Sequence, residues 1–472
     1  MRALILAQGD GRRWQRPDGS LPLGVPKHLV QVDGQTLVER IVGQLSERGV
    51  SDIVVVGPDE DRYRVAGARL VTLNQPHPTA TSMDKLIGTR ELWAEEDRTT
   101  ILWGDCYYSS EAMDLIVACD SADPHWFRRP WPSEITGHKW DESFAFSFLP
   151  EHHEDVHDLA DLIADTVPAR KIHMWRHYAG QLGQDPATAR IRDYEHTPHQ
   201  TVIDDFTDDI DSWAEWCAWM GRYHAGRVPL AVCIPWWDTG CPWRQASAEW
   251  TEKYWRDLGV PVVYGTGESR SAARNDAART AIGQGAEVLV FTDADTIVPA
   301  HQLWAAAHLA RESDRLVPAY VTHVRMDRAS TTRRLRQDPG RSLPRRGREV
   351  QGSASGCIAI SAGSYIAVGG HDERFIAWGG EDRAFQYACD TLLGPGERIH
   401  GRSFHLWHPP SESARKGDPG RAENVALALR YKEAAGYRPV AGVLGRTPSA
   451  EPCAESVRAI LAEPGGPYDT WR

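Results

Sequence analysis

The sequence predicts an α/β protein of two tandem domains, each a mostly parallel sheet covered by helices. Apolar strand-like runs alternate with amphipathic helical runs, and this alternation stops near residue 225 and then begins again. The length of 472 residues also exceeds that of one ordinary domain. We therefore expect domains over 1–224 and 225–410, followed by a helical C-terminal extension over 411–472.

The individual elements follow from these runs. Turn residues separate short apolar segments from longer segments with apolar residues at helical spacing. Strands are predicted over 2–9, 51–57, 99–108, 228–237, 260–265 and 287–296, and helices over 35–49, 211–226, 245–259, 271–285, 421–436 and 453–462.

Composition excludes several classes of protein. Hydrophobic residues make up 41% and charged residues 25%, which is typical of a water-soluble globular chain without a membrane segment. The net charge of −12 argues against broad electrostatic binding to nucleic acid or anionic membrane. Eight cysteines without a C-x-x-C pair indicate reduced thiols, so we expect a cytoplasmic protein.

A glycine-rich loop follows the first predicted strand. In "LAQGDGRRW", Gly9 and Gly11 allow backbone N–H groups to approach an anion, and Arg12 and Arg13 add positive charge. Downstream, "VPKHLVQVDGQTLVERI" places Lys27 just before a strand, a turn and a helix. The loop is thus a candidate triphosphate site.

In order and spacing, these segments resemble the nucleotidyltransferases that make nucleotide sugars and related activated alcohols. The resemblance covers about residues 1–220, and it implies that Arg13 and Lys27 contact the triphosphate while a sugar phosphate attacks the α-phosphorus. It also implies a divalent metal, Mg²⁺ or Mn²⁺, held by Asp105 and by an aspartate of "TVIDDFTDDIDSW", with Asp204 favoured over Asp205. The resemblance assigns the nucleotide-binding residues Leu6, Ala7, Gly9, Gly11 and Arg12. Gln8 replaces the family's usual small residue, which leaves the base of the nucleotide open.

A second acidic motif ends the predicted strand over 287–296. Asp293 and Asp295, spaced i and i+2 on an extended tip, can approach one cation together. Such carboxylates repel one another unless a cation lies between them or they face solvent.

The segments "SAARNDAARTAIGQGAEVLVFTDAD", "VGGHDERFIAWGGEDRAF" and "FHLWHP" together resemble GT-A glycosyltransferases. The nearest branch includes β-1,4-galactosyltransferases, chondroitin-type polymerases and polypeptide N-acetylgalactosaminyltransferases, and the resemblance covers about residues 228–410. It implies a second Rossmann-like, GT-A-like domain that binds a nucleotide-sugar donor. Its implied site residues are Pro235, Arg274 and Asn275 at the nucleotide, Asp293 and Asp295 at the metal, and His405 or His408 as a further metal ligand.

The same resemblance places "WGGED" at the acceptor. Asp382 is the expected base that takes the proton of the acceptor hydroxyl, and Glu381 is expected to hold donor or acceptor hydroxyls. Gly379 and Gly380 allow close approach of the backbone to a sugar, and Trp378 offers a stacking face. The alternative is a helix N-terminus that carries two favourable acids.

An arginine-rich segment, Arg325–Arg348, lies between the two acidic motifs. It contains nine arginines and two aspartates. Such a segment is either a surface loop or a binding site for an anionic acceptor, such as nucleic acid or a phosphorylated glycan. The acceptor class, whether glycan, protein or nucleic acid, stays open.

The sequence as a whole predicts a bifunctional enzyme that activates a sugar 1-phosphate with an NTP and then transfers the sugar to an acceptor hydroxyl. Two alternatives remain at this point. In one, only the C-terminal domain is active, and the first domain is a scaffold or a second glycosyltransferase. In the other, the chain is a sugar- or nucleic-acid-binding protein with degenerate sites.

Overall fold

The chain divides into two compact units, Met1–Trp219 and Met220–Arg472. The computed structural model describes residues 1–9, 11–73, 81–190, 198–337, 347–376, 379–409, 419–436 and 453–470. The division falls inside helix α6 (Trp213–Tyr223), whereas the sequence predicted a boundary between residues 224 and 225. None of the helices in the described ranges has the length and apolar composition needed to span a bilayer.

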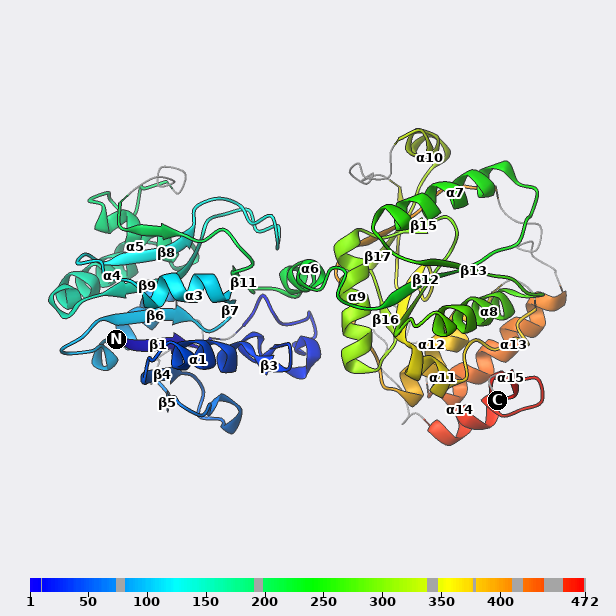
Figure 1. Ribbon diagram of the computed structural model, residues 1–472, viewed down its shortest axis with the longest axis horizontal. Helices are drawn as coiled ribbons and strands as arrows, with labels where there is room; N and C mark the ends of the chain where they lie inside the picture. Colours follow the sequence, from blue (N-terminus) through cyan, green and yellow to red (C-terminus); the bar gives the residue numbers. More distant parts are fainter. Residues whose placement is uncertain are drawn as a thin grey trace. The chain divides into compact units, whose positions relative to one another are not determined.

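The first unit is built on a seven-stranded sheet in the order β10-β8-β9-β6-β1-β4-β5 (Figure 1). Strand β9 is antiparallel to both of its neighbours, and the other pairings are parallel, which confirms the predicted mostly parallel sheet. Its strands are β1 (Arg2–Leu6), β4 (Asp52–Val56), β5 (Arg69–Val71), β6 (Thr99–Trp103), β8 (His125–Arg129), β9 (Glu142–Phe148) and β10 (Gln200–Val202).

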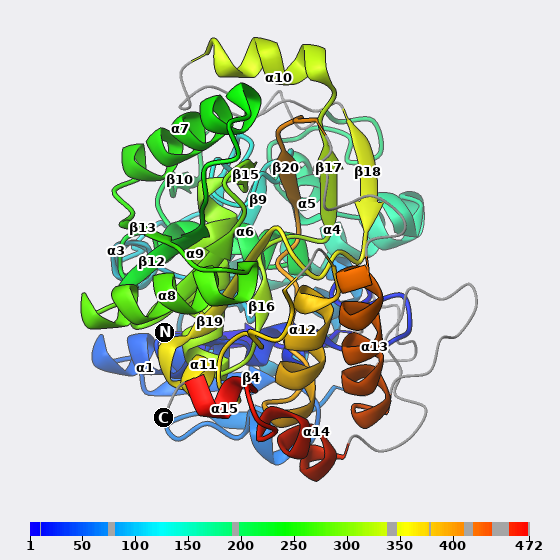
Figure 2. The same ribbon diagram turned by 90° about the vertical axis from the view of Figure 1, so that its right-hand side faces the viewer.

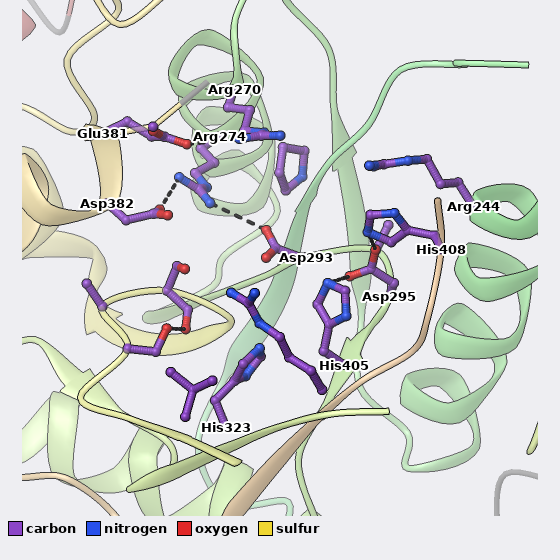
Figure 3. A pocket seen from close by; sticks show the side chains of 18 of the residues that line it. Arg244, Arg270, Arg274, Asp293, Asp295, His323, Glu381, Asp382, His405 and His408 are labelled. Atoms are coloured by element: carbon purple, nitrogen blue, oxygen red, sulfur yellow. Dashed lines mark hydrogen bonds and ion pairs between the residues drawn. The ribbon is translucent and has the colours of Figure 1, made fainter. Parts of the chain in front are cut away.

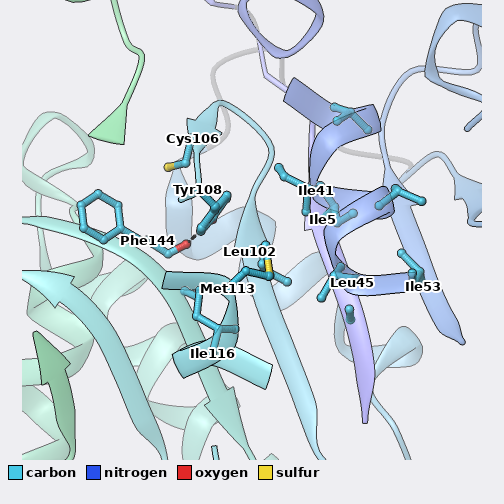
Figure 4. Packing of buried hydrophobic residues seen from close by; sticks show 14 of the residues in the cluster. Ile5, Ile41, Leu45, Ile53, Leu102, Cys106, Tyr108, Met113, Ile116 and Phe144 are labelled. Atoms are coloured by element: carbon cyan, nitrogen blue, oxygen red, sulfur yellow. Dashed lines mark hydrogen bonds between the residues drawn. The ribbon is translucent and has the colours of Figure 1, made fainter. Parts of the chain in front are cut away.

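Helices cover both faces of this sheet, because alternate residues of each buried strand point to opposite faces. In β1, Ala3 and Ile5 pack with helices α1 and α3, as Figure 4 shows for Ile5, whereas Leu4 and Leu6 pack with α2, α4 and α5. The helices are α1 (Leu37–Glu47), α2 (Ser82–Gly88), α3 (Ser110–Val117), α4 (His153–Thr166) and α5 (Met174–Gln181).

The second unit contains a five-stranded sheet in the order β13-β12-β14-β19-β16. Strands β12, β13 and β14 run parallel, whereas β19 is antiparallel to β14 and β16, so this sheet is mixed. A smaller sheet, in the order β15-β20-β17-β18, carries the segment that follows β14. The strands are β12 (Leu230–Pro235), β13 (Val262–Gly265), β14 (Val288–Thr292), β15 (Thr296–Ile297), β16 (Val317–Pro318), β17 (Thr322–Arg325), β18 (Arg348–Gln351), β19 (Cys357–Ser361) and β20 (Arg402–His405).

The helices after residue 410 belong to the core of the second unit. Tyr431 of α13 and Val457 and Leu461 of α14 are buried in one cluster with Phe375 and Phe385. Figure 2 shows α13 beside α12, and α14 below them. The segment predicted as an extension is therefore part of this fold. The helices of the unit are α7 (Pro242–Asp257), α8 (Arg270–Gly283), α9 (Ala300–Ser313), α10 (Arg328–Leu335), α11 (Ala362–Val368), α12 (Glu381–Leu392), α13 (Pro419–Ala434), α14 (Ala454–Leu461) and α15 (Pro467–Thr470).

A glycine sets how closely β13 approaches α8. A Cβ atom on Gly265 would lie 1.9 Å from the carbonyl oxygen of Ala273 and 2.5 Å from the backbone nitrogen of Ala277. We predict that Gly265→Ala lowers the free energy of unfolding by about 1–3 kcal/mol or more, because rigid backbone must move. Chemical denaturation of the two proteins measures this difference.

The matched control is Gly283→Ala, at the other end of α8, where an added Cβ meets nothing within 4 Å. That variant should be unchanged or more stable, by up to about 1 kcal/mol, since alanine is the better helix former. Equal destabilisation by both substitutions would contradict the packing argument.

Candidate active sites

In the first unit, the candidate site lies at the carboxyl ends of β1 and β6. These strands are parallel neighbours, so the glycine loop after β1 and Asp105 after β6 leave the sheet at the same edge. Gly104 permits this closeness, because a Cβ there would lie 3.0 Å from both the carbonyl oxygen of Leu6 and the Cβ of Ala7. The hydroxyl of Tyr108 accepts a hydrogen bond from the Trp103 amide (3.0 Å) and donates one to the Phe144 carbonyl (2.6 Å), which fixes the turn that holds Asp105 (Figure 4).

Lys27 is the centre of this site. Its Nζ atom forms an ion pair with Asp105 and another, of 2.7 Å, with Oδ1 of Asp211, which also pairs with Arg13. Burial lowers the pKa of Lys27, but the charges of Asp105 and Asp211 outweigh burial and raise that pKa well above its usual value. Lys27 is therefore a largely buried cation, with 12% of its side chain exposed, that two carboxylates hold in place.

The acidic run after β10 contributes Asp209 and Asp211 to this site, and the structure does not bring Asp204 into it. Strand β11 (Asp208–Asp209) pairs antiparallel with β7 (Cys106–Tyr107), which sets Asp209 opposite Cys106, next to Asp105. Asp204 instead accepts a hydrogen bond of 3.3 Å from the Trp131 indole. The structure thus brings Asp209 next to Asp105, where the sequence led us to expect Asp204.

The residues around Asp105 fit a divalent cation. Ligand atoms of Asp105, Cys106 and Asp209 lie within 4.8 Å of one another, and Oδ1 of Asp209 is buried without a hydrogen-bond partner among the described residues. Burial, followed by the charges of Asp211 and Asp105, raises the pKa of Asp209. A cation between the two carboxylates would relieve that repulsion, and carboxylate oxygens suit Mg²⁺ or Mn²⁺.

The other residues predicted to bind nucleotide lie in the glycine loop and at the end of β1. Leu6 and Ala7 are buried, and Gly11 adopts a φ of +55°, which favours glycine. A Cβ on Gly9 would lie 3.0 Å from Nζ of Lys85, a cation that the sequence analysis missed. Arg12 and Arg13 are exposed at the end of the loop.

In the second unit, a cavity of about 720 Å³ opens at the carboxyl ends of β12 and β14 (Figure 3). Its lining brings together most residues predicted for the glycosyltransferase site. They are Pro235, Arg274, Asp293, Asp295, Gly379, Gly380, Glu381, Asp382, His405 and His408.

Three of these residues form a candidate metal site. Nε2 of His405 lies 3.4 Å from Oδ1 of Asp295, and Nε2 of His408 lies 3.2 Å from Oδ2, so both histidines join the group. The antiparallel pairing of β15 with β20 brings Thr296 opposite His405 and thereby sets the group together. Its mixed nitrogen and oxygen ligands fit Mn²⁺ better than Ca²⁺.

Asp293 faces a different partner from Asp295. Arg274, from the buried side of α8, lies 3.5 Å from Oδ1 of Asp293 and 2.6 Å from Oδ1 of Asp382 (Figure 3). Arg270, one turn earlier, lies 3.2 Å from Oε1 of Glu381. Two arginines of one helix thus hold both acids at the N-terminus of α12.

Glu381 is the more buried of these two acids. Burial, followed by the charge of Asp382, raises its pKa. Its Oε2 atom has no hydrogen-bond partner among the described residues. Asp382 is more accessible, with 23% of its side chain exposed, which suits a group that exchanges a proton with a substrate.

Asn275 does not line the cavity. It is fully buried, accepts hydrogen bonds from the Tyr365 hydroxyl (2.6 Å) and the His371 amide (2.9 Å), and donates to Glu373 (2.7 Å). Next to Arg274 on a helix, Asn275 points to another face, so the structure does not bring it into the cavity where it was predicted to border the nucleotide. Trp378 lies outside the described residues.

The arginine-rich segment begins as a helix. Arg328–Leu335 forms α10, in which Arg334 is buried and stacks over Trp250, with the guanidinium carbon 4.8 Å from the ring centre. Arg325, at the end of β17, lines the cavity. Residues 338–346 of the segment lie outside the described ranges.

Comparison with known families agrees with the geometry of the first unit. Residues 3–133 match the MobA-like NTP transferase domain. This stretch includes Lys27 and Asp105 and ends before Asp209. The match supports nucleotidyltransferase activity in the first unit.

Solved structures of nucleotidyltransferases align with less than half of the chain. The CTP:phosphocholine cytidylyltransferase from Streptococcus pneumoniae is 16% identical, with 46% of this chain and 95% of that chain covered and a TM-score of 0.28. The inositol-1-phosphate CTP transferase from T. maritima is 16% identical, with 45% and 90% covered and a TM-score of 0.31. The UTP-bound UGPase from Acinetobacter baumannii is 14% identical, with 47% and 93% covered and a TM-score of 0.32.

Proposed function

We propose that the chain is a bifunctional enzyme whose first unit couples an NTP to a sugar 1-phosphate and whose second unit transfers the sugar to an acceptor hydroxyl. The family match over residues 3–133 supports the first activity. The second rests on one observation, the group of Asp295, His405 and His408 in a cavity that also contains Asp382.

In the first unit, a phosphate oxygen of the sugar 1-phosphate attacks the α-phosphorus of the NTP. The bond to pyrophosphate breaks, and its electron pair leaves on the pyrophosphate. Lys27 and Arg13 neutralise the phosphates, so each exchanges part of its contact with Asp105 or Asp211 for nucleotide. A divalent cation on Asp105 and Asp209 would neutralise further charge on the transferring phosphoryl group.

In the second unit, the acceptor oxygen attacks the anomeric carbon of the donor. The carbon–oxygen bond to the diphosphate breaks as the new bond forms, and Asp382 takes the proton of the acceptor hydroxyl. Arg274 orients Asp382, and Oε2 of Glu381, which has no hydrogen-bond partner in the described part of the chain, binds a sugar hydroxyl. A divalent cation on Asp295, His405 and His408 would neutralise charge on the diphosphate.

Pyrophosphate release tests the first activity. The protein is incubated with each NTP, a panel of sugar 1-phosphates and Mg²⁺ or Mn²⁺, and pyrophosphate is measured. Release with one combination is expected. If no combination releases pyrophosphate, the first unit is a scaffold or a second glycosyltransferase.

Asp382→Asn tests the second activity. The amide keeps the shape of the side chain but cannot take a proton, so we expect transfer to fall by about 10²- to 10⁴-fold while donor affinity stays within about threefold. Radiolabelled transfer and isothermal titration with the donor measure the two quantities. Asp257→Asn, on the exposed part of α7, is the control and should leave both unchanged.

Retained transfer by Asp382→Asn would exclude this residue as the base. Loss of donor binding together with transfer would point instead to a structural role for the Asp382–Arg274 pair.

A further inference from the structure

Arg244 lies beside the candidate metal site of the second unit and forms no ion pair with a carboxylate among the described residues, although its charge acts on Asp295. It lies in the first turn of α7, lines the cavity and extends toward His408 (Figure 3). Arg270 and Arg274 face Glu381 and Asp382, whereas the Arg244 side chain makes no hydrogen bond or ion pair with another described residue.

This position needs an explanation, because a guanidinium repels a metal ion bound nearby. Asp295 already faces two histidines, and the positive charge of Arg244 acts on Asp295 and His408 in addition. A metal ion and the Arg244 guanidinium on one side of a cavity repel each other, and an anion that binds between them would offset this repulsion. The arrangement therefore points to a ligand with more than one anionic group.

Aromatic packing fixes Arg244 relative to the metal site. Its neighbour Trp243 packs edge-on against Trp407, with ring centres 5.1 Å apart, and Trp407 directly precedes His408. The guanidinium of Arg328 lies over both rings, at 5.2 and 5.5 Å. The first turn of α7 is thus held against Trp407, just after β20, which fixes the position of Arg244 relative to His408.

We propose that Arg244 binds the diphosphate of the donor across the site formed by Asp295, His405 and His408, and so selects nucleoside diphosphate sugars. This inference rests on the function proposed for the second unit. When the bond from the anomeric carbon to the diphosphate breaks, the electron pair goes to the terminal phosphate oxygen, and Arg244 neutralises that charge. A guanidinium suits this role, since it donates two parallel hydrogen bonds to one phosphate.

Arg244→Ala is expected to weaken the binding of a nucleoside diphosphate without weakening the binding of Mn²⁺. The affinity for a nucleoside diphosphate in the presence of Mn²⁺ should fall by about 10- to 100-fold, as expected for the loss of charged hydrogen bonds. The affinity for Mn²⁺ alone should be unchanged or higher, because a neighbouring positive charge is removed. The diphosphate affinity of Arg244→Lys should lie between that of the protein with Arg244 and that of Arg244→Ala. The affinity for UMP should change less than the affinity for UDP or GDP.

The experiment uses the full chain with Asp105→Asn as background, so that metal binding in the first unit is weakened. Bound Mn²⁺ is counted by electron paramagnetic resonance, and UDP, GDP, UMP and inorganic pyrophosphate are titrated by calorimetry. Asp295→Asn in the same background identifies the binding that belongs to the second unit. Arg256→Ala is the matched control, an exposed arginine of α7 that pairs with Glu252 at 2.7 Å and should behave as the background does.

Unchanged diphosphate affinity in Arg244→Ala would overturn the proposal. An equal loss of Mn²⁺ and diphosphate binding would also overturn it, because that result means that the substitution displaces His408. If the background protein binds no Mn²⁺ that Asp295→Asn removes, the function proposed for the second unit fails as well, and the two failures are thereby distinguished.

Discussion

Asp295→Asn is expected to remove Mn²⁺ binding from the second unit and to lower sugar transfer by about 10³-fold. The substitution takes away the Asp295 carboxylate, which faces both His405 and His408. A metal ion contributes several kcal/mol to charge stabilisation in such transfers, and each 1.36 kcal/mol corresponds to a factor of ten in rate. Transfer from a supplied nucleotide sugar and bound Mn²⁺ are measured on the same samples.

Asp293→Asn is the informative comparison. Asp293 contacts Arg274 and does not join the histidine group, so its substitution should lower Mn²⁺ affinity less than Asp295→Asn does. If the two variants lose metal equally, both carboxylates are ligands, as the spacing of the motif alone would suggest.

Asp105→Asn is expected to lower pyrophosphate release by about 10²- to 10³-fold and to leave transfer from a supplied nucleotide sugar unchanged. It removes a carboxylate that pairs with Lys27 and that lies beside Asp209. Lys27 keeps its contact with Asp211, so the buried cation stays paired and the unit should remain folded. Pyrophosphate release and thermal unfolding check both statements.

The acidic run after β10 supplies a matched pair for this prediction. Asp209→Asn should resemble Asp105→Asn, whereas Asp204→Asn should alter pyrophosphate release by less than about threefold, since Asp204 contacts Trp131. A larger effect of Asp204→Asn than of Asp209→Asn would contradict the site described above.

The sequence predicts those site residues whose position is set by a single strand and the turn that follows it. Asp105 and Asp295 each follow a buried apolar strand, and parallel strands end at one edge of a sheet, so both could be placed from local pattern alone. The α/β class and the mostly parallel first sheet follow from the same alternation.

Features that depend on contacts between distant segments could not be predicted in this way. The pairing of β11 with β7 selects Asp209 over Asp204, and nothing local to the acidic run indicates that pairing. Arg274 and Asn275 are adjacent in a helix, where neighbouring side chains point about 100° apart, so a motif that includes both does not say which one faces the cavity. Arg244 has no motif at all and is found through its place in the cavity lining.

The packing of α13 and α14 has a consequence for the order in which the chain becomes active during synthesis. Gly380 lies directly against α13, since a Cβ there would come within 3.1 Å of the Asn424 carbonyl oxygen, and the core behind α12 includes Leu461. The turn that presents Glu381 and Asp382 therefore lacks its support until the segment through Leu461 has left the ribosome. The first unit has no such requirement, because its core uses residues before 220. On the ribosome, the nascent chain should therefore acquire the proposed nucleotidyl transfer well before the proposed sugar transfer.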